Sequence, residues 1–182
     1  MYIRHLCYPV KVLGPGRRLG IWFSGCRKHC PGCMSADLKE RRASDWIDLS
    51  LLKEMILPRA SEIDGVTISG GEPFDQMEAL TELVEFLAHE VTADILVYSG
   101  YVYSEIKSMN GAERALSGIS TLIDGEYRSE LDDGTGLRGS SNQKVVYLKG
   151  AARYDYEHAR RNRQVFSFED DALAIGLRSR DG

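Results

Sequence analysis

The chain has 182 residues, of which 43% are hydrophobic and 27% charged, and its formal net charge at pH 7 is −4. These values are typical of one globular domain with a sizeable core, and they give no electrostatic reason to expect nucleic acid or an anionic membrane as a partner. No apolar run approaches the ~20 residues that a membrane-spanning helix needs, and the first residues lack the apolar stretch of a signal peptide. We therefore expect a cytoplasmic protein, in which clustered cysteines bind metals more often than they form disulfides.

Apolar periodicity predicts strands that alternate with helices after a lead-in over residues 1–15. Strands are expected over 19–23, 66–69, 94–98, 118–123 and 144–148, and helices from 48 onward, over 76–90 and over 104–109. This alternation indicates an α/β fold, with a parallel sheet covered by helices. A terminal β-hairpin is predicted from residues 164–168 and 172–177, with its turn at Glu169-Asp170-Asp171. The arginines before it are interpreted as a solvated basic patch, formed by Arg160, Arg161 and Arg163.

Three of the four cysteines lie within eight residues, as Cys26, Cys30 and Cys33, in the spacing C-x3-C-x2-C. Pro31 and Gly32 prevent a continuous helix between them, so the thiols lie on a compact loop. Because disulfides use cysteines in pairs, three close thiols leave one over.

The spacing alone leaves several kinds of site open. A structural zinc needs four ligands, and the fourth would have to be Cys7, His29 or His5. A 4Fe–4S cluster is held by cysteine thiolates, and three of them leave one iron with an open coordination position. In the third interpretation, the three cysteines are buried thiols that bind no metal.

Four loops are expected to meet at one edge of the sheet. Each follows a predicted strand, and the carboxyl ends of parallel strands are where α/β folds place their chemistry. The loops are the cysteine loop, Gly70-Gly71-Glu72, Ser99-Gly100 and Asp124-Gly125.

The cysteine motif followed by Gly70-Gly71-Glu72-Pro73 resembles the radical S-adenosylmethionine (radical SAM) superfamily. Further segments resemble one branch of it, the activating enzymes of anaerobic (class III) ribonucleotide reductases, over about residues 8–148. These segments are Gly14-Pro15-Gly16-Arg17, Ser24-Gly25-Cys26, Cys30-Pro31-Gly32-Cys33, Tyr98-Ser99-Gly100-Tyr101, Leu122-Ile123-Asp124-Gly125 and Leu137-Arg138-Gly139-Ser140-Ser141-Asn142-Gln143.

The resemblance implies a partial (βα) barrel of the radical SAM type, with residues 1–150 as the core and residues 151–182 as a C-terminal β-hairpin extension packed on it. It implies that Cys26, Cys30 and Cys33 ligate a 4Fe–4S cluster whose open iron chelates S-adenosylmethionine (SAM). Gly70, Gly71 and Glu72 would hold the amino group of SAM. Further cofactor contacts would come from Ser99, Asp124, Arg138, Ser140 and Asn142, and Ser141 and Gln143 would line the same SAM-facing or partner-facing rim.

The activity that the resemblance implies is reductive cleavage of SAM to methionine and a 5′-deoxyadenosyl radical, which takes a hydrogen atom from a glycine of the reductase. A flavodoxin or ferredoxin would supply the electron, and the hypothesis for its attraction is a basic collar at Arg27-Lys28-His29. No nucleic acid or membrane partner is expected.

Two alternatives stand beside this assignment. Met34-Ser35-Ala36-Asp37-Leu38 stands where the family has an Asn and a Trp, and a predicted hairpin extends the chain at its C-terminal end. Because of these departures, the first alternative is a radical SAM enzyme whose substrate is a peptide or small metabolite in a specialised pathway. The second alternative is a non-catalytic zinc or thiol scaffold.

Overall fold

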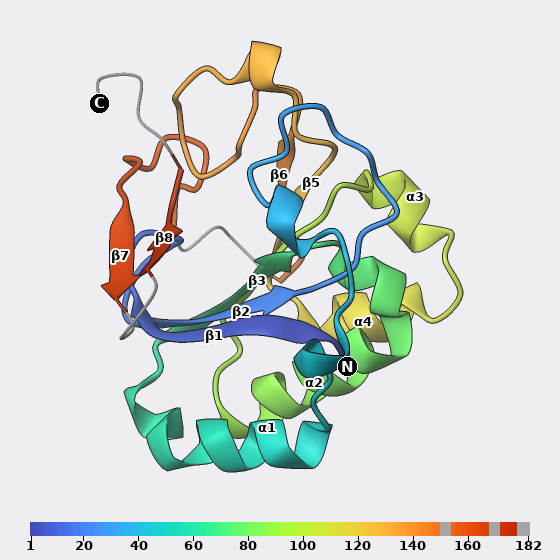
Figure 1. Ribbon diagram of the computed structural model, residues 1–182, viewed down its shortest axis with the longest axis vertical. Helices are drawn as coiled ribbons and strands as arrows, with labels where there is room; N and C mark the ends of the chain where they lie inside the picture. Colours follow the sequence, from blue (N-terminus) through green and yellow to red (C-terminus); the bar gives the residue numbers. More distant parts are fainter. Residues whose placement is uncertain (150–153, 168–171, 178–182) are drawn as a thin grey trace.

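The computed structural model describes residues 1–149, 154–167 and 172–177. Its centre is a six-stranded sheet in which the spatial order of the strands follows their order in the chain. The inner strands β2 to β5 are parallel, whereas the edge strands β1 and β6 run antiparallel to their neighbours (Figure 1). The strands are β1 (Ile3–Val10), β2 (Arg18–Phe23), β3 (Gly65–Gly70), β4 (Ile95–Tyr98), β5 (Thr121–Asp124) and β6 (Lys144–Tyr147). The expected α/β fold is confirmed.

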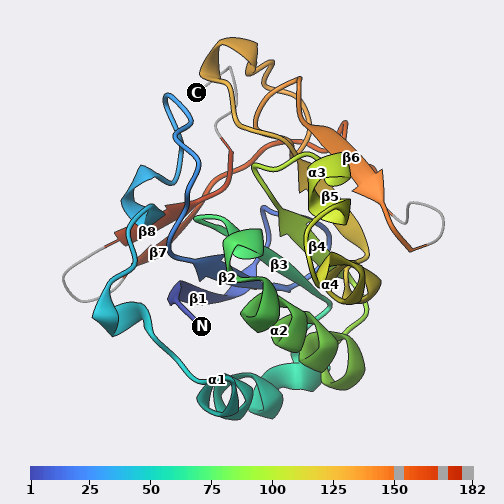
Figure 2. The same ribbon diagram turned by 90° about the vertical axis from the view of Figure 1, so that its right-hand side faces the viewer.

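Helices connect the parallel strands and gather on one face of the sheet (Figures 1 and 2). They are α1 (Leu49–Ile56), α2 (Met77–Glu90), α3 (Tyr103–Lys107) and α4 (Ala112–Gly118). Short 3-10 helices are η1 (Ala36–Leu38), η2 (Ala43–Asp45), η3 (Leu57–Glu62), η4 (Pro73–Gln76) and η5 (Ser129–Leu131). In the part of the chain that the structure describes, no helix combines the length and apolar character needed to cross a bilayer.

Both faces of the sheet are buried, and the alternation of side chains along β2 shows how. Leu19, Ile21 and Phe23 belong to the large core that β2 shares with the helices. Trp22 points to the other face, where it packs in a second cluster with Val10 and other apolar residues. Since successive side chains of a strand point to opposite faces, the apolar side chains on each face must be shielded from water by a separate layer of residues.

The second face is covered partly by the C-terminal part of the chain. Ile175 belongs to the cluster around Trp22, and Tyr156 packs with Leu96 and Ile123 in a third cluster. This region contains β7 (Gln164–Ser167) and β8 (Ala172–Ile175), which pair antiparallel and lie away from α1 and α2 in Figure 1. The expected hairpin turn at Glu169-Asp170-Asp171 lies outside the described residues.

Most of the sequence-predicted elements are confirmed within a few residues, but two differ for physical reasons. The predicted lead-in over residues 1–15 is wrong, because Ile3–Val10 form the edge strand β1. Its register on β2 shifts twice, so the regular alternation that marks a strand is missing from the sequence. The strand expected from residue 118 begins only at Thr121, because α4 continues to Gly118.

An ion pair with a buried guanidinium joins the amino ends of three parallel strands, at the edge opposite the predicted site. The side chain of Arg18 is fully buried, and its Nη1 lies 2.9 Å from Asp94 Oδ2. Its Nε donates to Thr67 Oγ1 at 2.7 Å and its Nη2 to the Val66 carbonyl at 2.6 Å. A buried guanidinium with this many acceptors fixes the alignment of β2, β3 and β4, because any slip would leave charge unpaired.

A second ion pair predicts how stability depends on acid. Arg4 on β1 donates to both carboxylate oxygens of Asp45, at 2.6 and 2.8 Å, and this lowers the pKa of Asp45 from 3.8 to about 2. A lowered folded-state pKa contributes stability above the unfolded pKa, and this contribution is lost as the pH falls from about 4 towards 2.

We therefore expect Asp45→Asn to lower the free energy of unfolding by about 2 kcal/mol at pH 6, and by progressively less below pH 4. Urea unfolding at several pH values measures this difference, with the exposed Glu54→Gln on α1 as the control. A difference that stays constant with pH would contradict the assignment.

Candidate functional site

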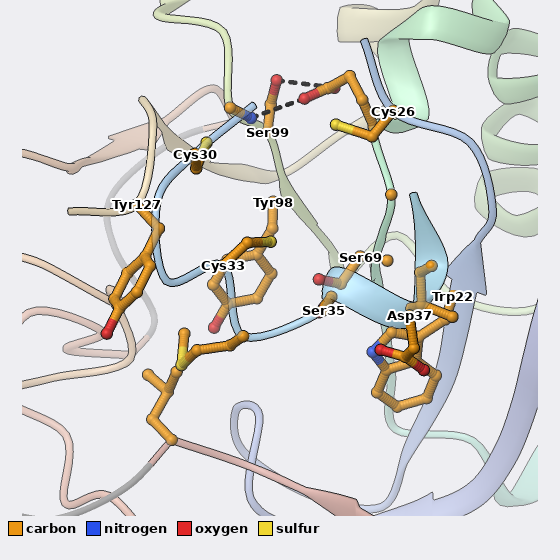
Figure 3. Close-up of a pocket in the computed structure, with 18 of the residues that line it drawn as sticks. Trp22, Cys26, Cys30, Cys33, Ser35, Asp37, Ser69, Tyr98, Ser99 and Tyr127 are labelled. Carbon is orange, nitrogen blue, oxygen red and sulfur yellow. Dashed lines mark hydrogen bonds between the residues drawn. The ribbon is translucent and has the colours of Figure 1, made fainter. Parts of the chain in front are cut away.

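A pocket with a cavity volume of about 260 Å³ lies at the carboxyl ends of the parallel strands. The prediction that four loops meet there is confirmed, because each of them contributes to the lining (Figure 3). From these loops the lining residues include Cys26, Cys30, Cys33, Gly70, Gly71, Glu72, Ser99, Gly100 and Gly125.

The cysteine loop leaves β2 and folds back on itself. Cys26 N–H donates to the Lys39 carbonyl at 3.0 Å, and Cys33 N–H donates to the Cys30 carbonyl at 3.3 Å, which closes the turn through Pro31. The three cysteines are free and partly exposed. Figure 3 shows them spread along the loop, so they offer thiols around a space rather than at one point.

The end of β3 lies directly against the beginning of the cysteine loop. Gly71 N–H donates to the Phe23 carbonyl and Glu72 N–H to the Gly25 carbonyl, both at 2.8 Å. A Cβ atom on Gly70 would overlap the Phe23 backbone, and one on Gly71 would overlap the Gly25 carbonyl. The two glycines are therefore required for this close approach, independently of any ligand.

The Glu72 carboxylate is buried in the pocket wall, with only 1% of the residue exposed. Its oxygens accept hydrogen bonds from Ser99 Oγ at 2.9 Å, Gly100 N–H at 2.7 Å and Phe74 N–H at 3.0 Å (Figure 3). Burial nevertheless raises the pKa of Glu72 to about 7. The Ser99 hydroxyl thus orients Glu72, and it also accepts from Tyr101 N–H at 3.0 Å.

Lys28 lies within the cysteine motif and lines the pocket, which the sequence did not predict. Its side chain is only 17% exposed, and its Nζ lies 3.0 Å from Glu126 Oε1 and 4.3 Å from the ring centre of Tyr101. These contacts tie the cysteine loop to the loops that follow β4 and β5. Arg27 and His29 on either side are exposed, so only they match the solvated reading of this stretch.

The donor set fits a 4Fe–4S cluster. Burial raises the pKa of Cys26 to about 11 and also raises the pKa of Cys30, so these thiols need a nearby positive charge to ionise, and bound iron supplies it. Cys7 is buried and packs with Val10 and Trp22, as a small apolar residue does. Among the described residues, no three His, Cys, Asp or Glu side chains converge on a position for a single metal ion.

Comparison with known proteins points to the same kind of cofactor. Residues 12–146 match the family model of the 4Fe-4S single cluster domain. The anaerobic ribonucleoside-triphosphate reductase-activating protein of Escherichia coli (strain K12) is 31% identical over 155 residues, which is 80% of this chain and 98% of that protein. The chain belongs to this family of activating proteins. Proteins of the same name from Vibrio cholerae and phage T4 are 31% and 30% identical, covering 78% and 74% of this chain and 95% and 86% of their own.

Four residues predicted as cofactor contacts do not line the pocket of this family member: Asp124, Arg138, Ser140 and Asn142. Asp124 accepts from the backbone N–H groups of Tyr103 and Lys144, at 2.6 and 3.2 Å, and so connects β5 to α3 and β6. Asn142 donates to the Glu126 carbonyl at 2.8 Å. In the structure these polar groups shape the loops around the pocket, and their contact with a cofactor stays a prediction.

The other two residues act within the same loop. Ser140 Oγ accepts from Arg128 N–H at 3.1 Å. Arg138 pairs with Asp133 at 2.8 Å, while its buried Nε has no hydrogen-bond partner among the described residues.

Gln143, which the family resemblance places on the rim of the site, is a pocket residue. Its Oε1 accepts from the N–H groups of Gly139 and Ser140, at 2.7 and 3.1 Å, and its Nε2 donates to the Gly125 carbonyl at 2.7 Å. The side chain therefore holds the turn over 137–143 against the end of β5. The sequence signal for Gln143 was an amide side chain directly before a strand, and ordinary turns carry amide side chains at such positions as well.

The Glu72 network predicts the effect of an isosteric change. In Glu72→Gln, the side-chain amide would face a backbone N–H, so at least one buried donor would lose its acceptor. This loss is about 1–3 kcal/mol in unfolding free energy. Because burial raises the pKa of Glu72 to about 7, the wild type also loses stability as the pH rises from about 4.5 through 7, whereas glutamine does not titrate. We therefore expect the stability of Glu72→Gln relative to the wild type to increase by about 3 kcal/mol between pH 4 and pH 8. Chemical denaturation of the cofactor-free protein measures this, with the exposed Glu54→Gln on α1 as the control. A stability difference that does not change with pH would contradict the burial of this carboxylate.

The contact between β3 and the cysteine loop predicts that Gly71 tolerates no side chain. Gly71→Ala places its Cβ onto the Gly25 carbonyl, so we expect a loss of about 1–3 kcal/mol in unfolding free energy. Gly100→Ala is a matched control, because its Cβ would lie 3.4 Å from the nearest atom, Glu72 Oε2. If both variants lose the same stability, the close approach is not what selects glycine at position 71.

Proposed function

We propose that this chain is a radical SAM enzyme that holds a 4Fe–4S cluster and generates a glycyl radical on an anaerobic ribonucleotide reductase. The observation that carries the proposal is one pocket in which three free cysteines face the Gly70-Gly71-Glu72 segment. Membership of the activating-protein family supports the choice of protein substrate.

The pocket residues would divide the binding of the two cofactors. Cys26, Cys30 and Cys33 would ligate three irons, and the backbone of Gly70 and Gly71 would lie against the amino group of SAM. When bound, the cluster supplies one electron that cleaves SAM to methionine and a 5′-deoxyadenosyl radical, which takes a hydrogen atom from glycine. Glu72 is held by Ser99 and Gly100 in the pocket wall, where its charge can complement an ammonium group.

Further parts of the proposal concern the surroundings of the site. A flavodoxin or ferredoxin would deliver the electron, attracted by the exposed Arg27 and His29 beside the pocket. The open sheet with β1 and β6 at its edges would correspond to the partial (βα) barrel of radical SAM proteins. A cytoplasmic location is proposed because clustered free thiols persist there.

The metal content of the anaerobically reconstituted protein tests the first step. We expect a brown protein with ~4 irons per chain, and we expect Cys26→Ala to lose most of the iron and colour. Cys7→Ala serves as the control, because Cys7 lies outside this pocket. A colourless protein that contains zinc would favour the scaffold alternative.

The reaction is tested by adding reductant, SAM and a class III ribonucleotide reductase. We expect methionine, 5′-deoxyadenosine and a glycyl-radical doublet in the EPR spectrum. Cleavage of SAM without that doublet would sink the assignment of the protein substrate and favour the peptide or small-metabolite alternative.

A further inference from the structure

The C-terminal part of the chain lies outside the family match, yet it lines the pocket. The matched region ends at residue 146, whereas residues 173–177 form part of the same lining as the three cysteines. These five residues of β8 and its end are called the β8 wall. The pocket of this chain is therefore built in part from residues that the family model does not include.

The β8 wall is apolar and faces apolar partners. It consists of Leu173, Ala174, Ile175, Gly176 and Leu177. Ile175 and Leu177 are buried, at 4% and 7% exposure, and Ile175 packs in the cluster that contains Leu13, Trp22 and Leu38. Figure 3 shows Trp22 at one end of the pocket, with Cys30 and Tyr127 towards the other. Asp37 lies beside Trp22 in the same view, so this end of the pocket combines the apolar β8 wall with a charged side chain.

A buried arginine anchors this C-terminal segment to the pocket rim. The side chain of Arg161 is 1% exposed, and its Nη1 lies 2.6 Å from Asp132 Oδ1. Its Nη2 donates to the Arg138 carbonyl at 2.6 Å and its Nε to the Gly136 carbonyl at 2.9 Å. The interpretation of Arg161 as part of a solvated basic patch is therefore wrong. All these acceptors belong to the loop that leads to Gly139 of the pocket.

Backbone packing adds to the anchor. Leu137 N–H donates to the Tyr156 carbonyl at 2.8 Å, and a Cβ on Gly136 would overlap the Glu157 carbonyl. Gln164 bonds to β1 from the same segment, because its Nε2 donates to the Pro9 carbonyl and its Oε1 accepts from Lys11 N–H, at 2.8 and 2.9 Å. The segment is thus attached near both edges of the sheet, to the loop before β6 and to the end of β1, and these contacts fix the position of the β8 wall.

We propose that the β8 wall, anchored through Arg161, is a specificity-determining part of this pocket that limits which hydrogen donors reach it. The inference rests on the proposed function. Bulk is excluded at this end of the pocket because Ile175 and Leu177 are buried and Ile175 packs against Trp22. The hydrogen donor that passes the wall is therefore a narrow one.

The cofactor-free protein tests the wall without any reaction. Alkylation rates of Cys26, Cys30 and Cys33 by iodoacetamide are measured by mass spectrometry for the wild type, Arg161→Met and Arg163→Met. Arg163 is the matched control, because it is exposed in the same segment. We expect alkylation to be about tenfold faster in Arg161→Met only, since loss of the anchor favours local opening. Equal rates in all three proteins would overturn the proposal.

A second variant keeps the anchor intact, in case Arg161→Met does not fold. Leu173→Trp adds bulk on the face of β8 that packs towards the cluster of Trp22, and Val165→Trp adds it on the opposite, exposed face of the hairpin, where it does not line the pocket. We expect slower alkylation of the pocket cysteines in Leu173→Trp than in Val165→Trp. The same rate in both would overturn the proposal.

In the reconstituted enzyme, the decisive quantity is the number of glycyl radicals formed per methionine released. This ratio does not depend on the fraction of folded protein, so a merely structural defect leaves it unchanged. We expect Leu173→Trp to lower it severalfold while SAM is still cleaved, and Val165→Trp to leave it at the wild-type value. If the wild type yields no glycyl radical, the proposed function fails, and the alkylation rates still decide whether the wall controls access. An unchanged ratio in Leu173→Trp would overturn the role in specificity.

Discussion

The structure of the site depends on the contact between the end of β3 and the first residues after β2. Hydrogen bonds from Gly71 and Glu72 to the Phe23 and Gly25 carbonyls continue the pairing of the two strands beyond the sheet. This brings the cysteine loop and the Glu72 carboxylate to the same side of one pocket. The approach is so close that only glycine fits at positions 70 and 71. These glycines therefore set the geometry on which any cofactor binding would depend.

The rest of the rim is held by polar side chains that bond to the backbone rather than to each other. Gln143 links its own turn to the end of β5, and Asp124 links β5 to α3. Lys28 adds an ion pair across the pocket with Glu126. Each bond is formed by a buried or half-buried group, which makes an alternative loop position costly because a donor or acceptor would be left unpaired. A pocket built in this way is rigid before any ligand arrives.

The sequence was sufficient for the parallel strands, for α2 and for the meeting of four loops, because long apolar patterns and strand ends are local signals. It was not sufficient for β1, whose register shifts hide its alternation. The burial of Arg161 was also invisible, because it arises from acceptors more than twenty residues away in the chain. Similarly, the motif that contains Arg138, Ser140 and Asn142 was visible in the sequence. Only the fold shows that these side chains bond within their own loop and to neighbouring segments.

The two buried faces of β2 also bear on how the chain could be shortened. A fragment cut at residue 146 would contain the whole family match. It would lack Ile175, which packs against Trp22, and Tyr156, which packs against Leu96 and Ile123. That fragment would present an apolar sheet surface to water and would be prone to aggregate. The region shared with relatives and the unit that folds therefore have different boundaries in this protein.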